Sequence, residues 1–109
     1  MRATREELPI MLEAGPSSIR GADWGEMRVS LVSVPAGTDF SPLLRGLPED
    51  RCQGPHWGYV LKGRMRVIYA DREEVVEAGD AYYMAPGHTL FVEADVELVE
   101  FRIVPRGVV

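Results

Sequence analysis

The sequence is poor in the residues on which several common classes of protein depend. Its 109 residues include one cysteine and two histidines. One cysteine excludes an intrachain disulfide, which favours a protein of a reducing compartment, the cytoplasm. No apolar run approaches the roughly 20 residues that a membrane-spanning helix requires. Residues 1–7 also lack the apolar stretch of a signal peptide.

The chain also lacks an excess of basic residues. It has 12 lysines and arginines against 17 aspartates and glutamates, and its pI is about 5.0. This balance gives no electrostatic footprint for nucleic acid or for an anionic membrane, so we expect neither as a partner. A small-molecule ligand remains compatible with it. At this length, a composition that is 46% hydrophobic predicts one domain with one core, spanning residues 1–109.

What the sequence does contain is the pattern of β-strands separated by turns. In residues 27–34, Met27, Val29 and Leu31 occupy one face, which is typical of a half-buried antiparallel strand. Aromatic and β-branched runs or alternation predict further strands at residues 56–63, 64–70, 73–77, 81–84 and 96–104. We interpret Gly63 as a turn that closes the first of these.

The first 25 residues are predicted to be an arm with loops, followed by a barrel over residues 26–104. Thr4 and Glu7 have the spacing of a helix capping box, but Pro9 would remove a backbone donor from the next turn. An extended arm with alternating apolar residues fits equally well. Glycine and proline predict loops at residues 15–18 and 41–51.

One stretch, from Asp50 to Leu90, contains a pattern with a specific spacing. Its first half ends at Gly63 and resembles the first signature motif of the cupin superfamily, in which two histidines and a glutamate precede a glycine. Asp50 and Cys52 stand at the two histidine positions, and His56 stands at the glutamate position. The glycine is therefore kept, while all three usual metal ligands differ.

The second half resembles the second cupin motif and begins at Gly79. Gly87 matches the second glycine of that motif. Ala85, Leu90 and Ala94 occupy the positions of its proline, histidine and asparagine. The resemblance covers roughly residues 26–104, and it supports the fold better than the function because fold and chemistry are separable.

The resemblance implies an all-β fold, an antiparallel double-stranded β-helix or jelly-roll barrel of the cupin type. By the same analogy it implies a small-molecule ligand inside the barrel. It also implies a homodimer in which the N-terminal arm pairs with a neighbouring subunit. In a cupin, the loop of residues 41–51 lies at the mouth of the barrel, where it could gate a ligand.

Cys52, His56 and His88 are the candidate metal ligands. A thiolate with imidazoles suits zinc, and iron, nickel or manganese are further candidates. His88 lies two positions from the motif's histidine, so a changed loop path is needed to bring it to the site. The plainer alternatives are a buried, hydrophobe-like Cys52 and a solvated His88 in its Pro-Gly-His turn.

The candidate residues of a ligand pocket are His56, Tyr82, Tyr83 and Glu100. Tyr82 and Tyr83 are neighbours in a strand, so one of them faces the barrel interior, where it either contacts a ligand or packs in the core. Glu100 is buried only if its face of residues 96–104 points inward, and it is then a metal ligand, a base or a partner of Arg102. In the opposite orientation Glu100 lies on the surface.

Two functions follow from these residues. The first is a small-molecule-binding cupin, a sensor, carrier or accessory domain, with a non-standard divalent-metal site or none. The second is a metal-dependent enzyme, an oxygenase, isomerase or lyase, in which His56 is a ligand or a general base. The altered ligand positions favour the first. A purely structural module would give no reason for His56 beside a glycine-rich strand.

Overall fold

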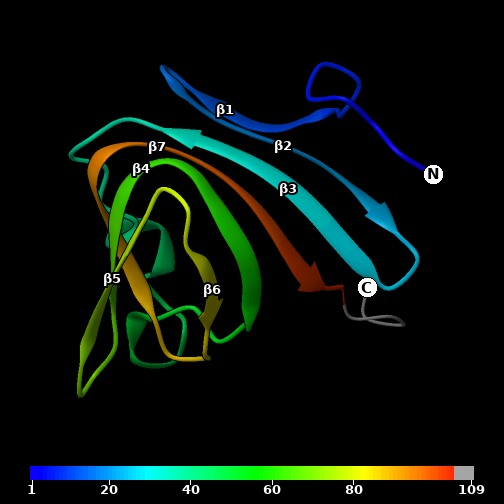
Figure 1. The fold of residues 1–109 in the computed structure, drawn as a ribbon. Helices are drawn as coiled ribbons and strands as arrows, with labels where there is room; N and C mark the ends of the chain where they lie inside the picture. Colours follow the sequence, from blue (N-terminus) through cyan, green and yellow to red (C-terminus); the bar gives the residue numbers. More distant parts are fainter. Residues whose placement is uncertain (105–109) are drawn as a thin grey trace.

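Antiparallel β-strands make up nearly all of the fold (Figure 1). The structure is a computed structural model that describes residues 1–104. Its strands are β1 (Ile10–Ala14), β2 (Ser17–Trp24), β3 (Met27–Val34), β4 (His56–Ile68), β5 (Glu73–Glu77), β6 (Ala81–Met84) and β7 (Thr89–Ile103). Two short 3₁₀ segments, η1 (Ser41–Leu44) and η2 (Pro48–Asp50), lie between β3 and β4. None of the helical segments in residues 1–104 has the length and apolar character needed to cross a membrane.

The strands pair in the order β1-β2-β3-β7-β4-β5, and β6 pairs with β4. β7 is the central strand, because it pairs with β3 over residues 96–103 and with β4 over residues 89–101. In Figure 1, β1, β2 and β3 run side by side as one curved layer, and β4 arches opposite them beside β5 and β6. This is the antiparallel jelly-roll barrel that the sequence predicts, so the fold prediction is confirmed.

The continuity of β4 shows that the predicted turn at Gly63 is wrong. β4 runs through this residue without a break. Gly63 has a φ of 87°, and a Cβ there would collide with the carbonyl oxygen of Asp95 on β7. The pairing of β4 with β7 shifts register between Lys62 and Arg64. The glycine therefore marks a bulge that bends one long strand.

The N-terminal residues form more strand than the sequence predicts. Thr4 and Glu7 make the two reciprocal bonds of a capping box, at 2.8 and 3.3 Å, yet they close a turn and no helix follows. β1 then pairs with β2 of the same chain. Ser17 and Ser18, predicted as loop, begin β2 because they pair with β1. The sheet is thereby extended beyond β3 by two strands.

The remaining strand predictions agree with the structure in place and differ in length. β3, β5 and β6 coincide with the predicted segments 27–34, 73–77 and 81–84. β7 starts at Thr89, earlier than the predicted start at Val96. Its first half pairs with residues 65–68 of β4 and also contacts the chain at Gly37 to Phe40 through backbone hydrogen bonds.

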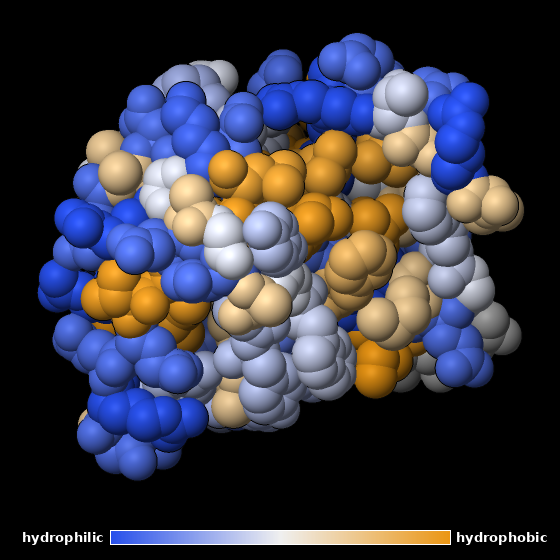
Figure 2. Space-filling model, viewed as in Figure 1, coloured by the Kyte–Doolittle hydropathy of each residue, from blue (hydrophilic) through white to orange (hydrophobic). Residues whose placement is uncertain are grey.

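The core lies inside the barrel and follows the alternation of its strands. Its buried residues are Val34, Val60, Met65, Val67, Tyr69, Tyr82, Met84, Val92, Val96 and Leu98. Full burial of one such aliphatic side chain contributes about 1.5–3 kcal/mol. Figure 2 shows apolar residues gathered in a band over β3 and β7, flanked by hydrophilic ones, so part of the apolar surface stays open on this face.

Candidate functional site

A cavity of about 440 Å³ lies inside the barrel. Much of its wall is apolar and includes Val32, Val34, Phe40, Leu90, Val96 and Leu98. Leu43 and Leu44 of η1 also line it, so the loop of residues 41–51 borders the cavity as the resemblance implies. The volume falls within the range of about 300–1,000 Å³ that is usual for small-molecule sites.

The cavity changes from polar to apolar along β3 and β7. The register of the two strands places Arg28 opposite Arg102, Ser30 opposite Glu100, Val32 opposite Leu98, and Val34 opposite Val96. All of these residues line the cavity. Alternate residues of a strand share a face, so the inward face of β7 is the one that carries Glu100. The sequence had left open which face points inward.

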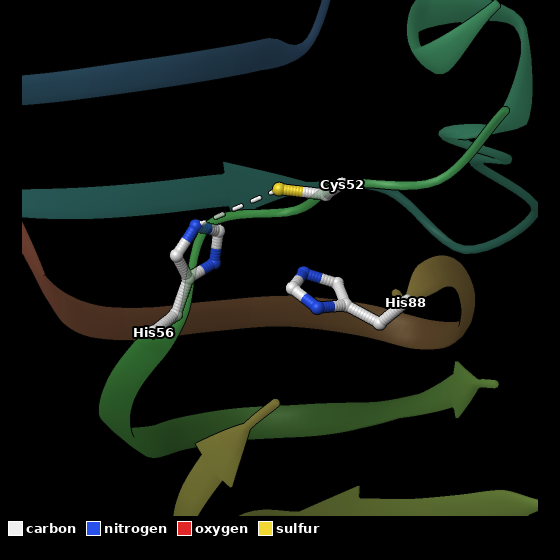
Figure 3. A group of neighbouring side chains, drawn as sticks. All are labelled: Cys52, His56 and His88. Carbon is white, nitrogen blue, oxygen red and sulfur yellow. Dashed lines mark hydrogen bonds between the residues drawn. The ribbon is translucent and has the colours of Figure 1, made fainter. Parts of the chain in front are cut away.

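Cys52, His56 and His88 lie together on the wall of this cavity (Figure 3). His56 is the first residue of β4, and His88 directly precedes β7. The backbone N–H of Cys52 donates to the carbonyl of His88 at 2.8 Å, which joins the two loops that carry them. One donor atom from each side chain lies within 4.8 Å of the others. This bridge supplies the loop path that the sequence required for His88.

The second ring nitrogen of each histidine faces an oxygen. Nδ1 of His88 donates to the carbonyl of Ala85 at 2.7 Å. Nδ1 of His56 lies 3.4 Å from Oε2 of Glu100 without a well-aligned hydrogen bond. Metal-binding histidines usually direct their second nitrogen to a carbonyl or carboxylate, which fixes the orientation of the ring. Nε2 of each imidazole is therefore the atom available to a metal, and that of His56 lies 3.9 Å from Sγ of Cys52.

Cys52 and His56 have strongly shifted pKa values. The imidazoles of His56 and His88 lower the pKa of Cys52 to about 5. Burial by itself lowers the pKa of His56, but the Cys52 thiolate and the Glu100 carboxylate outweigh it and raise that pKa to about 9. Between these values the site holds a thiolate beside an imidazolium. A thiolate is the form of cysteine that binds metals and acts as a nucleophile.

Gly58 lets Tyr82 reach Glu100 across β4. The register places Gly58 between Tyr82 of β6 and Glu100 of β7. The hydroxyl of Tyr82 donates to Oε1 of Glu100 at 2.8 Å. A Cβ at Gly58 would collide with that hydroxyl and with the carbonyl oxygen of Val99. Burial and the Glu100 carboxylate both raise the pKa of Tyr82, so it stays a hydrogen-bond donor.

The structure brings most of the predicted site residues together. The residues that line one cavity are Cys52, His56, His88 and Glu100, and Tyr82 donates a hydrogen bond to Glu100. Tyr83 does not join this group: it is 51% exposed on the outer face, where its ring centroid lies 5.4 Å from that of Trp57. Asp50, at the first motif position, is exposed in η2 and lies outside the Cys52 cluster.

Two arginines of the cavity wall, Arg28 and Arg102, were not predicted as site residues. In residues 27–34 the alternation puts Arg28 and Ser30 on one face of the strand without showing which face points inward. The structure decides the orientation, because the face of β3 that carries Arg28 and Ser30 lines the cavity. The sequence did carry one indication, which is that Arg102 shares a strand face with Glu100.

The donor set fits a divalent metal. Zinc binds thiolate sulfur at about 2.3 Å and imidazole nitrogen at about 2.0–2.1 Å, so donors that are within 4.8 Å of one another need only small side-chain adjustments. Three protein ligands leave a coordination position for a further molecule. Because all three residues line the cavity, that molecule would come from the cavity.

The fold and this site define a class of protein, the antiparallel β-barrels that carry imidazole donors on the wall of an interior cavity. The family model described as the cupin domain matches residues 30–104. The chain belongs to the cupin family. No functionally curated protein matches its sequence.

Solved structures of the same fold share little sequence with this chain. The polyketide cyclase RemF from Streptomyces resistomycificus is 18% identical with a TM-score of 0.70, covering 99% of this chain and 82% of RemF. An RmlC-like cupin from Shewanella frigidimarina is 15% identical with a TM-score of 0.67, covering 96% and 91% of the two chains. The iron(II) form of HppE is 13% identical with a TM-score of 0.66, covering 94% of this chain and 60% of HppE. At these identities the similarity concerns the fold alone.

Proposed function

We propose that this cupin domain binds a small molecule in the barrel cavity, beside a divalent metal held by Cys52, His56 and His88. The observation that carries the proposal is the meeting of these three donors on the wall of a cavity of about 440 Å³. Buried histidines in a mainly apolar wall require partners for their ring nitrogens. A metal bound by the Cys52 thiolate would be such a partner for the Nε2 atoms of His56 and His88.

The donor types favour zinc over the other candidates. A thiolate with two imidazoles is a borderline-soft set that suits zinc, whereas manganese prefers oxygen ligands. Iron and nickel remain alternatives that accept imidazole. When bound, a divalent ion would supply a Lewis-acid centre that polarises an oxygen of the bound molecule.

The chain's own residues perform the other tasks of this site. Glu100 faces Nδ1 of His56, and Tyr82 fixes Glu100, so the imidazole is held in one orientation. The apolar wall of Val32, Leu98 and their neighbours excludes water from the body of a ligand. Metal binding would displace the proton that His56 carries at neutral pH, because a ligand imidazole must be neutral.

Elemental analysis of protein purified without an affinity tag or chelator tests the proposal. We expect near-stoichiometric metal in the unaltered protein and its loss in Cys52→Ala and His88→Ala. Asp50→Asn is the matched control, since Asp50 occupies a motif position but lies outside the cluster. Absence of metal after reconstitution with zinc and iron(II), or retention in His88→Ala, would contradict the proposed centre.

A metal-dependent enzyme, an oxygenase, isomerase or lyase, is the second candidate. The chain of contacts from Cys52 through His56 to Glu100 favours it, because a carboxylate that orients an imidazole is common in catalytic sites. The raised pKa of His56 favours a proton donor over a general base at neutral pH in the metal-free site. Turnover by the metal-loaded protein that disappears in His56→Ala would establish an enzyme.

We also propose a cytoplasmic homodimer. A cysteine that has to stay reduced to bind a metal favours a reducing compartment. Trp57, Tyr83 and Phe101 are exposed by 40%, 51% and 39%, and the register places them side by side on the outer face of β6, β4 and β7. Contiguous apolar surface of this kind marks interaction sites. Sedimentation at micromolar concentration tests the dimer, and a monomer would contradict it.

A further inference from the structure

The strongest unexplained feature of the cavity is a pair of arginines at its polar end. Arg28 on β3 and Arg102 on β7 stand directly opposite each other, and both line the cavity. Like charges in opposed positions on neighbouring strands destabilise a sheet. The arrangement therefore calls for negative charge close to both guanidinium groups.

Among residues 1–104, a carboxylate is hydrogen-bonded to only one of the two arginines. Arg28 binds both oxygens of Asp23, with Nε to Oδ1 at 2.7 Å and Nη2 to Oδ2 at 3.2 Å. Arg102 makes no ion pair or side-chain hydrogen bond with any of residues 1–104. Glu100 is not an ion-pair partner of Arg102, because Oε1 of Glu100 accepts a hydrogen bond from Tyr82 and Oε2 faces His56. The carboxylate of Asp23 also attracts Arg102 electrostatically, so two guanidinium groups share one carboxylate at this end of the cavity. Within residues 1–104, the hydrogen-bond donors of the Arg102 guanidinium have no side-chain acceptor and remain available to a ligand.

The rest of the wall specifies the remainder of the ligand. On the inward faces of β3 and β7, the arginine row is followed by Ser30 and Glu100, and then by the apolar rows of Val32 with Leu98 and Val34 with Val96. Successive rows are separated by about 7 Å, the distance that two residues span along a strand. A molecule with an anionic group at one end and an apolar body matches this order.

We propose that the cavity binds an organic carboxylate with an apolar body, whose carboxylate pairs with Arg102 while its body lies against the valine and leucine rows. The proposal rests on the cavity of the proposed function and names its ligand class. A planar guanidinium binds carboxylate with two parallel hydrogen bonds, which gives orientation as well as affinity. The chain has a net charge of −5, so selection of an anion depends on this local cation.

Methionine methyl groups provide the readout. Met11 and Met65 line the cavity, whereas Met1 is fully exposed and Met84 is buried in the core without lining it. Protein labelled with ¹³C on the methionine methyls would be titrated with hexanoate and benzoate, and with hexanamide and benzamide as neutral counterparts. Occupancy of the cavity shifts the Met65 resonance, and an unchanged Met84 resonance shows that the core is intact.

We expect both carboxylates to shift Met65 and to bind at least tenfold more tightly than their amides. In Arg102→Gln this preference should disappear, and in Arg102→Lys it should remain at reduced affinity, because the charge stays while the planar fork is lost. Arg64→Gln is the matched control, since Arg64 pairs with Glu93 and does not line the cavity. Equal affinity for carboxylate and amide in the unaltered protein would overturn the proposal, as would an undiminished preference in Arg102→Gln.

Metal content separates this proposal from the proposed function. Carboxylate binding that depends on Arg102 and persists in metal-free protein supports the ligand class even if no metal is ever found. Carboxylate binding that is lost with the metal but unaffected by Arg102→Gln assigns the carboxylate to the metal and overturns the role of Arg102. Metal content that is unchanged in Arg102→Gln confirms that a loss of binding there does not come from the centre.

Discussion

Gly58→Ala is the substitution with the clearest expected consequence. Gly58 separates Tyr82 from Glu100, and an added methyl group would occupy the space of the tyrosine hydroxyl and contact the carbonyl of Val99. β4 cannot move away freely, because it pairs with β6 on one side and with β7 on the other at this residue. The tyrosine must therefore withdraw, and Glu100 loses its donor.

The magnitude follows from three contributions. Overpacking of this kind costs about 1–3 kcal/mol. Loss of a hydrogen bond to a charged group costs about 1.5–3 kcal/mol. Replacement of glycine by alanine offsets about 0.4–1 kcal/mol of this loss, because alanine lowers the conformational entropy of the unfolded chain. The free energy of unfolding should thus fall by about 2–5 kcal/mol, a large part of the 5–15 kcal/mol that is typical of a domain.

Urea denaturation followed by tryptophan fluorescence measures this change. With a slope of about 1–3 kcal/mol per molar urea, the midpoint should fall by about 1–3 M. Gly54→Ala is the matched control: a Cβ there meets only ordinary contacts, 3.7 Å from Nε2 of His56 and 4.0 Å from Sγ of Cys52. It should change stability by less than about 1 kcal/mol.

A double-mutant cycle makes the reasoning refutable. If the cost arises from the Tyr82 hydroxyl, Gly58→Ala should cost less in a Tyr82→Phe background than in the unaltered protein, by about 1 kcal/mol or more. Equal costs in the two backgrounds, or a Gly58→Ala protein as stable as its parent, would show that the hydroxyl does not cross β4 to Glu100.

Two further predictions concern the donor cluster. Because the imidazoles of His56 and His88 lower the pKa of Cys52 to about 5, its thiolate is present above that pH and is lost below it. Alkylation of Cys52 by iodoacetamide in the metal-free protein should therefore become slower only when the pH falls below about 5. In His56→Ala the decline should begin at a higher pH, because the thiolate loses the imidazole that stabilises it. A rate that rises steadily up to pH 8 in the unaltered protein would refute this. Zinc at about 100 times its dissociation constant should stabilise the fold by about 2.7 kcal/mol, or about 10 °C in Tm, and calorimetry should find no such shift in His88→Ala.

The fold was predictable because glycine spacing and strand alternation are local properties. Residues 27–34, 73–77 and 81–84 form the strands that their patterns predict. Gly63 was misinterpreted because a glycine at positive φ serves equally in a turn and in a bulge, and only the partner strand decides between them. The opposing carbonyl of Asp95 is remote in sequence and is not visible in the local pattern.

The site was predictable in its residue types but not in its arrangement. Cys52, His56 and His88 were identifiable because so few residues of the chain bind soft metals. The Cys52 to His88 bridge that joins them depends on two loops that are far apart in sequence. Arg28 was not predicted as a site residue, because alternation distinguishes two faces of a strand without showing which one is inside. In this barrel the face that carries Arg28 lines the cavity.

The position of the two histidines has a consequence for how the chain holds together. His56 begins β4 and His88 immediately precedes β7, so the two histidines mark the N-terminal ends of the two strands with the most extensive mutual pairing. A metal held by both would close a long loop of the chain, and a closed loop restricts the unfolded ensemble as a disulfide does. With one cysteine the chain cannot form that disulfide, and the centre would act as its cross-link.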